Sequence, residues 1–346
     1  MAFSTINKSS DYQNTVLYTG NASTQAITGV GFQPDWTWIK NRTAAGEGHH
    51  LYDAVRGVTK RVRTDTNALE STVATGLTTF GTDGFTVGSI AGVNGSTNGI
   101  ISWNWKAGTT TGITTNGSTT ITPSAYSFNT TSGCSIVKFT GTATSAQKIP
   151  HGLGAAPKFM MLKRLGSADD WYVYHYGISA NPSSEFLIAN TTAIIGNSGG
   201  AWSDTEPDSV NFTVGSRTNV NGTDGMIAYC FAPISGYSKF GSYEGNANVN
   251  GTFINTGFKP SWVMFKNCDG LNSWEIRDDK RSYNLNGDTL WANNSDAGSV
   301  GEGIDFLSNG FKCRASGAGQ NGSATYVYAA FGQPIISNSG VVATAR

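Results

Sequence analysis

The chain has 346 residues, and its 23 Lys and Arg residues balance its 23 Asp and Glu residues. A formal net charge of zero argues against nucleic-acid binding through phosphate neutralisation, and it provides no polybasic surface for an anionic membrane. Charged residues make up only 13% of the chain, whereas its 17 Phe, 13 Tyr and 9 Trp are more aromatic side chains than a disordered chain carries. This composition predicts a folded, turn-rich, all-β protein that works outside a cell or on a particle.

The first segment, residues 1–14, is short and polar. It has neither the basic region nor the apolar core of a signal peptide, so we expect no secretory export. No stretch approaches 18 consecutive apolar residues, and no membrane insertion is expected. We interpret residues 1–14 as an attachment arm that becomes ordered when it docks on a larger particle.

The next segment, residues 15–106, contains landmarks that return later in the chain. In order they are an aromatic residue in LYTGNAS, a proline followed by the apolar run WTWIK, the run HHLYD, the run DGFTVGS, an Asn-Gly pair, and the aromatic run IISWNW. Residues 134–233 and 237–333 repeat these landmarks in the same order and at nearly the same spacing. The recurring prolines are Pro34, Pro157 and Pro260. The chain therefore contains three homologous units.

The repeated runs predict strands, because WTWIK, FMMLK and WVMFK are too short for helices. A proline can stand at the entry of a strand without removing a ladder hydrogen bond. The unbroken apolar character predicts a central strand that is buried on both faces, or buried on one face and in a subunit contact on the other. WYVYH and WEIRD alternate, as expected for half-buried strands. We predict an all-β fold of three tandem β-sandwich domains, jelly-roll-like and of roughly 95 residues each.

Two other segments lie outside the repeats. Residues 107–133 are rich in Gly, Thr and Ser, which predicts a linker or an extended arm between the first two domains. The join between the second and third domains is short, so these two should pack closely. Residues 334–346 form a predicted C-terminal tail.

Candidate catalytic and metal-binding residues are few. Acidic residues cluster at Asp169-Asp170, at Glu275 with Asp278-Asp279, and at Glu302 with Asp305, but no acidic landmark is common to the three units. Glycoside hydrolysis needs two carboxyl groups about 5–10 Å apart, and no pattern indicates such a pair. Adjacent side chains of a strand point to opposite faces, so His49 and His50 should not bind one metal ion together. We expect no enzyme activity, no cofactor and no metal site.

The four cysteines form no C-x-x-C pair. We interpret them as buried thiols that act as small apolar side chains. The alternative is one disulfide between Cys134 and Cys230 and another between Cys268 and Cys313.

Two sets of residues are candidates for contacts. The basic run of the first unit is either a solvated loop or a contact with another subunit or an acidic glycan; it comprises Arg56, Lys60, Arg61 and Arg63. Aromatic residues at the repeated landmarks are assigned to the core. Those outside the pattern are candidate surface contacts for a sugar ligand, namely Trp202, Tyr176, Trp291 and Tyr283.

The whole chain resembles a family of repeat proteins of tailed bacteriophages, especially phages of marine bacteria and cyanobacteria. The resemblance rests on MAFSTINKSSDYQNTVLYTGN, GFQPDWTWIKN, DAVRGV, SWNWKAGTTTGITTNGSTTITPSAYSFN, HGLGAAPKFMMLK, MIAYCFA, GYSKFGSYEGN, TGFKPSWVMFK and DFLSNGFK. Members of that family are regarded as virion structural or tail-fibre-like proteins without assigned catalytic residues.

The resemblance implies a non-enzymatic virion protein, made in the host cytoplasm and released by lysis. We expect a surface-exposed tail fibre or spike component that takes part in particle assembly and in attachment to a host receptor or glycan. Its partners would be other virion proteins and further copies of itself, with a homotrimer preferred by analogy with fibres. Two alternatives remain: a capsid-decoration, head-fibre or vertex protein, and a polysaccharide depolymerase.

Overall fold

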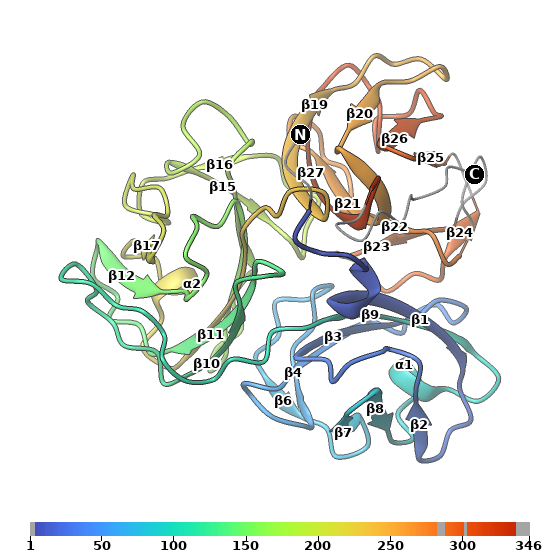
Figure 1. Ribbon diagram of the computed structural model, residues 1–346, viewed down its shortest axis with the longest axis horizontal. Helices are drawn as coiled ribbons and strands as arrows, with labels where there is room; N and C mark the ends of the chain where they lie inside the picture. Colours follow the sequence, from blue (N-terminus) through green and yellow to red (C-terminus); the bar gives the residue numbers. More distant parts are fainter. Residues whose placement is uncertain (1–3, 282–287, 301–302, 337–346) are drawn as a thin grey trace.

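The computed structural model describes residues 4–281, 288–300 and 303–336 (Figure 1). Antiparallel strands dominate it, and the helical segments it describes are single short turns. The predicted all-β class is confirmed. Among the described residues, no helix has the length and apolar character needed to cross a membrane.

The strands fall into three sets, which we call units 1, 2 and 3, arranged as three lobes around a common centre (Figure 1). Unit 1 comprises β1 (Gln13–Thr19), β2 (Gln25–Ile27), β3 (Trp36–Asn41), β4 (His49–Asp53), β5 (Lys60–Arg61), β6 (Ser71–Thr72), β7 (Leu77–Gly81), β8 (Gly84–Val87), α1 (Ala91–Asn94) and β9 (Gly99–Trp105), preceded by the 3-10 turn η1 (Ser9–Asp11).

Unit 2 comprises β10 (Ala125–Asn129), β11 (Cys134–Phe139), β12 (Gln147–Pro150), β13 (Phe159–Arg164), β14 (Tyr172–His175), β15 (Glu185–Ile188), β16 (Gly196–Asn197), β17 (Asn211–Val214), α2 (Thr218–Asn221) and β18 (Met226–Phe231). Unit 3 comprises β19 (Ser238–Glu244), β20 (Phe253–Asn255), β21 (Phe258–Asn267), β22 (Glu275–Asp278), β23 (Asp288–Trp291), β24 (Ser299–Val300), β25 (Ile304–Leu307), β26 (Gly310–Cys313) and β27 (Thr325–Pro334).

The same strand order recurs in the main sheet of each unit. It is β1-β9-β3-β4 in unit 1, β11-β18-β13-β14 in unit 2 and β19-β27-β21-β22 in unit 3. A smaller sheet accompanies each main sheet, with orders β2-β8-β7, β12-β17 and β20-β26-β25. The repeated landmarks of the sequence thus correspond to repeated positions in three sheets, while the domain boundaries given above remain a prediction.

The proline-led runs lie where the sequence predicts them. Strand β3 is flanked by β9 and β4, and all of its residues are buried. The equivalent strands β13 and β21 are likewise internal to their sheets. The prediction of half-buried strands for WYVYH and WEIRD is wrong, because every residue of β14 and β22 is buried. One face of these strands lies over the core of their own unit, and the other face packs against the neighbouring units.

Each unit has its own apolar core, and all three share a further one. The separate cores include Phe85, Phe212 and Phe311, one from each unit. The shared core contains side chains from all three main sheets. At its centre lie pairs of rings at equivalent register positions, Trp36 with Trp105, Phe159 with Phe231, and Trp262 with Phe331. Trp105 contacts Phe231 and Phe331, and Phe231 contacts Phe331, so rings of the three units meet directly.

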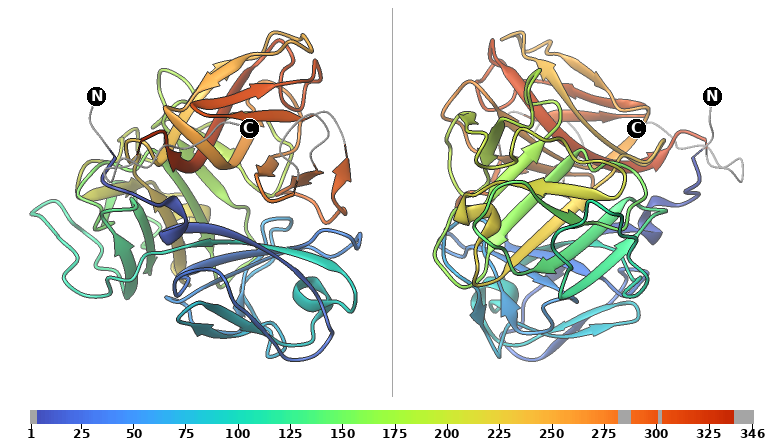
Figure 2. Two further views of the ribbon diagram at one scale, coloured as in Figure 1. Left: turned by 45° about the vertical axis from the view of Figure 1, so that its right-hand side comes forward. Right: turned by 90° about the vertical axis from the view of Figure 1, so that its left-hand side faces the viewer.

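The segments outside the repeats differ from the sequence-based prediction. Residues 4–14 are not a free arm, because the Ile6 side chain is fully buried in the shared core and the Ser9 amide donates to Gln333 Oε1 at 2.9 Å. Figure 1 shows this segment running from unit 3 to β1. Within residues 107–133, β10 pairs with β11 and extends the main sheet of unit 2. Figure 2 shows the chain between β9 and β10 passing from unit 1 to unit 2, where the Thr120 amide donates to the Lys148 carbonyl of β12 at 3.0 Å.

Candidate ligand sites at the unit junctions

Three pockets occupy equivalent places between the units. Asp53, His175 and Asp278 pair with the central aromatic residues Trp36, Phe159 and Trp262 in the sheet register. In each unit, the residue that follows this acid or histidine lines a pocket whose opposite wall is an early strand of the next unit. The volumes are about 300 Å³ at the unit 3/unit 1 and unit 2/unit 3 junctions and about 330 Å³ at the unit 1/unit 2 junction. We call them the 3/1, 2/3 and 1/2 pockets.

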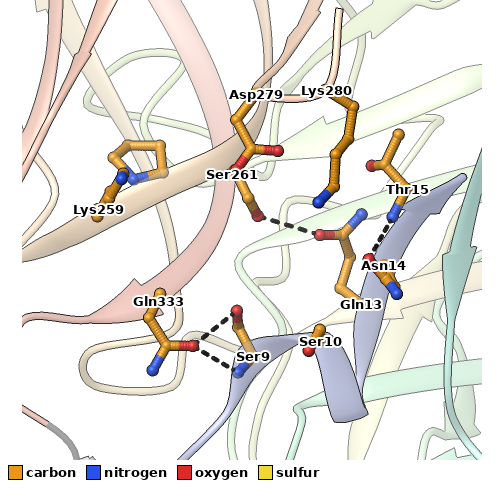
Figure 3. A pocket seen from close by; sticks show the side chains of 11 residues that line it. Ser9, Ser10, Gln13, Asn14, Thr15, Lys259, Ser261, Asp279, Lys280 and Gln333 are labelled. Carbon is orange, nitrogen blue, oxygen red and sulfur yellow. Dashed lines mark hydrogen bonds between the residues drawn. The ribbon is translucent and has the colours of Figure 1, made fainter. Parts of the chain in front are cut away.

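The 3/1 pocket is lined almost entirely by polar side chains (Figure 3). The lining residues come from η1 and β1 of unit 1 and from β21, β27 and the end of β22 of unit 3; they are Ser9, Ser10, Gln13, Asn14, Thr15, Lys259, Pro260, Ser261, Asp279, Lys280 and Gln333. The pairing of β21 with β27 shifts register between Pro260 and Trp262, and Ser261 lies at this bulge. Bulges re-aim side chains, and here the Ser261 hydroxyl lies 3.3 Å from Gln13 Oε1 and 3.2 Å from the Phe331 carbonyl, two acceptors that share its one proton.

Charges of both signs line this pocket. Burial raises the pKa of the Asp279 carboxyl to about 6, an effect that Lys280 and Lys259 oppose. Asp279 is therefore ionised above about pH 6, and the pocket then carries one carboxylate and two ammonium groups. Gln13 is only 2% exposed, and its Nε2 has no hydrogen-bond partner among the described residues.

The 2/3 pocket is aromatic. Its lining includes Tyr176, which is 41% exposed, and Phe253, which is 43% exposed. The ammonium of Lys158 lies 4.6 Å from the centre of the Tyr176 ring. Lys239, at the edge of the same pocket, donates to the Asn255 carbonyl at 2.7 Å. Exposed aromatic faces beside polar groups suit a ligand that presents both C–H faces and hydroxyl groups.

The 1/2 pocket is lined by uncharged residues, most of them small, namely Ala54, Val55, Thr110, Ser124, Ala125, Tyr126 and Ser127. Strand β10 supplies part of this wall, so the segment predicted as a linker completes the third junction. The three pockets are equivalent in position, but they present different chemistry to a ligand.

The aromatic residues predicted to lie at the surface differ in how exposed the structure shows them to be. Tyr176 lies at the mouth of the 2/3 pocket, where a ligand contact is feasible. Trp202 is only 1% exposed and donates its indole N–H to the Glu185 carbonyl at 2.8 Å, so the prediction of a surface contact is wrong for this residue. Trp291 is half-buried, and its carbonyl accepts from His49 Nε2. Tyr283 lies outside the described residues.

The four residues of the predicted basic run all bond to groups within the chain. The Arg56 side chain is 1% exposed and pairs with Asp53, whose carboxylate also accepts from the Tyr229 hydroxyl at 2.6 Å. Tyr229 belongs to unit 2, so Arg56 makes a junction contact within the chain, and both readings of it as an outward-facing residue are wrong. The remaining members of the run bond nearby: Lys60 with Thr72, Arg61 with Ser71, and Arg63 with Asp65.

Most candidate catalytic groups are likewise held in structural pairs. Asp169 pairs with Arg164, Asp278 with Arg281, and Asp305 with Arg314. Glu302 lies outside the described residues. Among the residues that the structure describes, no group of three or more His, Cys, Asp and Glu side chains could hold a metal ion. The four cysteines are free and buried, and burial raises the pKa of each thiol, so the interpretation as apolar thiols is confirmed.

Sequence reasoning missed the lysines that end the proline-led runs. Lys40, Lys163 and Lys266 are fully buried, and burial lowers the pKa of each ammonium to about 8. Each ammonium donates to backbone carbonyls, and two of the three reach a neighbouring unit: Lys40 bonds to Ser295 at 3.2 Å, and Lys163 bonds to Asn67 at 3.0 Å. The recurrence of a lysine at one position of every repeat is the signal that could have revealed this role.

Comparison with known proteins identifies a family for the chain. No curated protein and no solved structure matches the chain. One family model covers residues 8–334, which include the three main sheets and their junction pockets. The chain belongs to the family described as domain of unknown function DUF7483.

Proposed function

We propose that the chain is a surface-exposed structural protein of a tailed-phage virion, a tail fibre or spike component that contributes to particle assembly and to attachment to host-surface glycan. The sequence resemblance suggests the particle, and the junction pockets suggest the attachment. The observation that carries the second part is the 2/3 pocket, where Tyr176 and Phe253 expose their rings beside polar groups.

The internal use of charged side chains supports a scaffold or binding role over catalysis. The Asp53–Arg56 and Asp278–Arg281 pairs are buried at unit junctions, and a second hydrogen bond ties each carboxylate to the neighbouring unit. Groups held in this way stabilise one arrangement of the units and are not available to a substrate. A stiff body with several shallow pockets suits weak binding at each site, which many copies per particle would strengthen.

The partners that we propose are other virion proteins and further copies of the chain. The preference for a homotrimer stays a prediction. A single chain already places three units around one shared core, so additional copies would meet through outer surfaces and not through that core.

The proposal is tested by location and by adhesion. Immunogold labelling of virions of the phage that encodes the chain should mark the tail, and the purified protein should bind host cells. Tyr176→Ala should weaken that binding, whereas Leu271→Ser, which changes a side chain that is 75% exposed and lies outside the three pockets, should not. Labelling of the head without adhesion would support capsid decoration instead, and release of reducing ends from host polysaccharide would support a depolymerase.

A further inference from the structure

The 3/1 pocket contains a buried donor without an acceptor. Strand β1 begins at Gln13, and its pairing with Trp105 of β9 places the Gln13 side chain at the rim of the shared core. The amide oxygen lies 3.3 Å from the Ser261 hydroxyl, and Nε2 has no hydrogen-bond partner among the described residues. A buried amide N–H without an acceptor is destabilising. Such a group in a pocket indicates that a bound molecule supplies the acceptor.

Other donors converge on the same space. Figure 3 shows the Lys280 side chain extending its ammonium toward the Gln13 amide. The Lys259 side chain and the Ser10 hydroxyl also line the pocket. Amide and ammonium donors that point at one place favour an anionic acceptor there.

The shape and the remaining lining favour a ligand that also carries hydroxyl groups. Ser9, Thr15 and Asn14 add hydroxyl and amide groups to the walls, and the lining contains no aromatic ring. A volume of about 300 Å³ accommodates one or two small rings. Among the described residues, neither of the other junction pockets is lined by a buried donor that lacks a hydrogen-bond partner.

We propose that the 3/1 pocket binds the carboxylate of an acidic sugar, with Gln13 Nε2 and the Lys280 ammonium as donors to the carboxylate oxygens and with the serine and threonine hydroxyls facing the sugar hydroxyls. This inference rests on the proposed role in glycan attachment and specifies the class of glycan. The 2/3 pocket, by contrast, would contact uncharged sugar faces, so the two sites together would select a polysaccharide that contains both acidic and neutral residues.

The test uses the full chain and a tetrasaccharide of galacturonic acid. Calorimetric titration should show binding of the free acid, and its methyl ester, which differs only in charge and in the added methyl groups, should bind at least about tenfold more weakly. Lys280→Met should weaken binding of the acid to a similar extent. Lys148→Met, which changes a lysine of unit 2 that lines none of the three pockets, serves as the matched control and should leave it unchanged.

Gln13→Met removes the donor at nearly constant volume and should also weaken binding. Because Gln13 is buried, its variant is first checked for an unchanged thermal melt; Lys280 is exposed, so its variant provides the test if Gln13→Met unfolds. Equal affinity for acid and ester, no binding of the acid at millimolar concentration, or full binding by Lys280→Met would each overturn the inference. The proposed function is tested separately, by adhesion of the parent protein to host cells and by labelling of the tail. Failure of this inference is therefore distinguishable from failure of the proposed function.

Discussion

Trp171 of unit 2 donates its indole N–H to the carbonyl of Arg63 of unit 1 at 2.7 Å. His49 and Trp274 hold the same position in units 1 and 3, and each bonds to a carbonyl of the neighbouring unit at 2.9 Å, His49 to Trp291 and Trp274 to Ile188. The bonds run from unit 1 to unit 3, from unit 3 to unit 2 and from unit 2 to unit 1. They therefore close a ring of contacts around the shared core, and the units cannot separate without breaking two of them.

Replacing Trp171 tests this ring. Trp171→Phe retains a ring in the shared core but removes the donor, which leaves the Arg63 carbonyl without that bond. We expect a loss of about 1–3 kcal/mol in the free energy of unfolding, with faster amide hydrogen exchange in residues 60–65. Trp202→Phe removes an equivalent bond to Glu185 inside unit 2 and should accelerate exchange there, not in unit 1. Unchanged exchange in residues 60–65 of Trp171→Phe would contradict a role for this bond in joining the units.

The strands could be predicted from the sequence because their signals are local. The proline before WTWIK, FMMLK and WVMFK and the unbroken apolar run that follows specify a buried central strand without reference to distant residues. The wrong prediction that β14 and β22 are half-buried has a different cause. Tyr172 and His175 look solvent-compatible in sequence, but Tyr172 lies in the core of unit 2, and His175, on the opposite face of the strand, bonds to the Tyr328 carbonyl of unit 3. Packing between units leaves no local pattern.

The candidate sites were less accessible to prediction for the same reason. Each junction pocket joins residues far apart in the chain, as Gln13 and Lys280 show. Tyr176 could be found because it lies outside the repeated pattern, whereas Trp202, selected on the same criterion, is buried in the core of its own unit. A residue outside the repeated pattern occupies a position that the shared core does not require, but the pattern does not show whether its side chain is exposed.

Arg56 provides a second prediction. Its side chain is 1% exposed and pairs with Asp53, which is also buried. Arg56→Leu leaves the Asp53 carboxylate in the interior without its cation, and breaking a buried pair in this way costs about 3–5 kcal/mol. Arg61→Leu, which removes a half-buried guanidinium bonded to Ser71, is the matched control and should cost far less. Chemical denaturation measures both, and equal losses would show that the Arg56 pair is not the source.

The glycine of the repeated TGN, TGT and EGN triplets gives a third prediction. A Cβ at Gly141 would lie 2.4 Å from the Asn221 backbone carbon, and equivalent contacts meet a Cβ at Gly20 and Gly245. Gly141→Ala must therefore displace backbone, and we expect a loss of about 1–3 kcal/mol. Gly117→Ala, where nothing lies within 4 Å of the added carbon, should leave stability unchanged in the same thermal melts. A neutral Gly141→Ala would show that this contact relaxes at no cost.

Three buried histidines contribute to the pH dependence of stability. Nδ1 of His49 accepts the indole N–H of Trp38 at 2.7 Å, so Nε2 carries the proton and donates to Trp291. His151 and His175 have the same arrangement, with Nδ1 accepting a backbone N–H and Nε2 donating to a carbonyl. Burial lowers the pKa of His49 to about 3 and the pKa values of His151 and His175 to about 4.

An unfolded histidine takes up its proton near pH 6.5, whereas these folded ones stay neutral to about pH 4. Between these values the unfolded chain binds more protons, so the free energy of unfolding should fall as pH drops from about 6.5 to 4, by about 1.4 kcal/mol per pH unit for each histidine. Asp279, whose pKa is raised, acts in the opposite direction. The contribution of one histidine is therefore measured by comparing the pH dependence of its variant with that of the parent protein. His175→Gln can keep a donor toward Tyr328, and it removes one titrating group. Urea titrations from pH 7.5 to 4.5 should give it a shallower decline than the parent, and parallel curves would exclude His175 as a contributor.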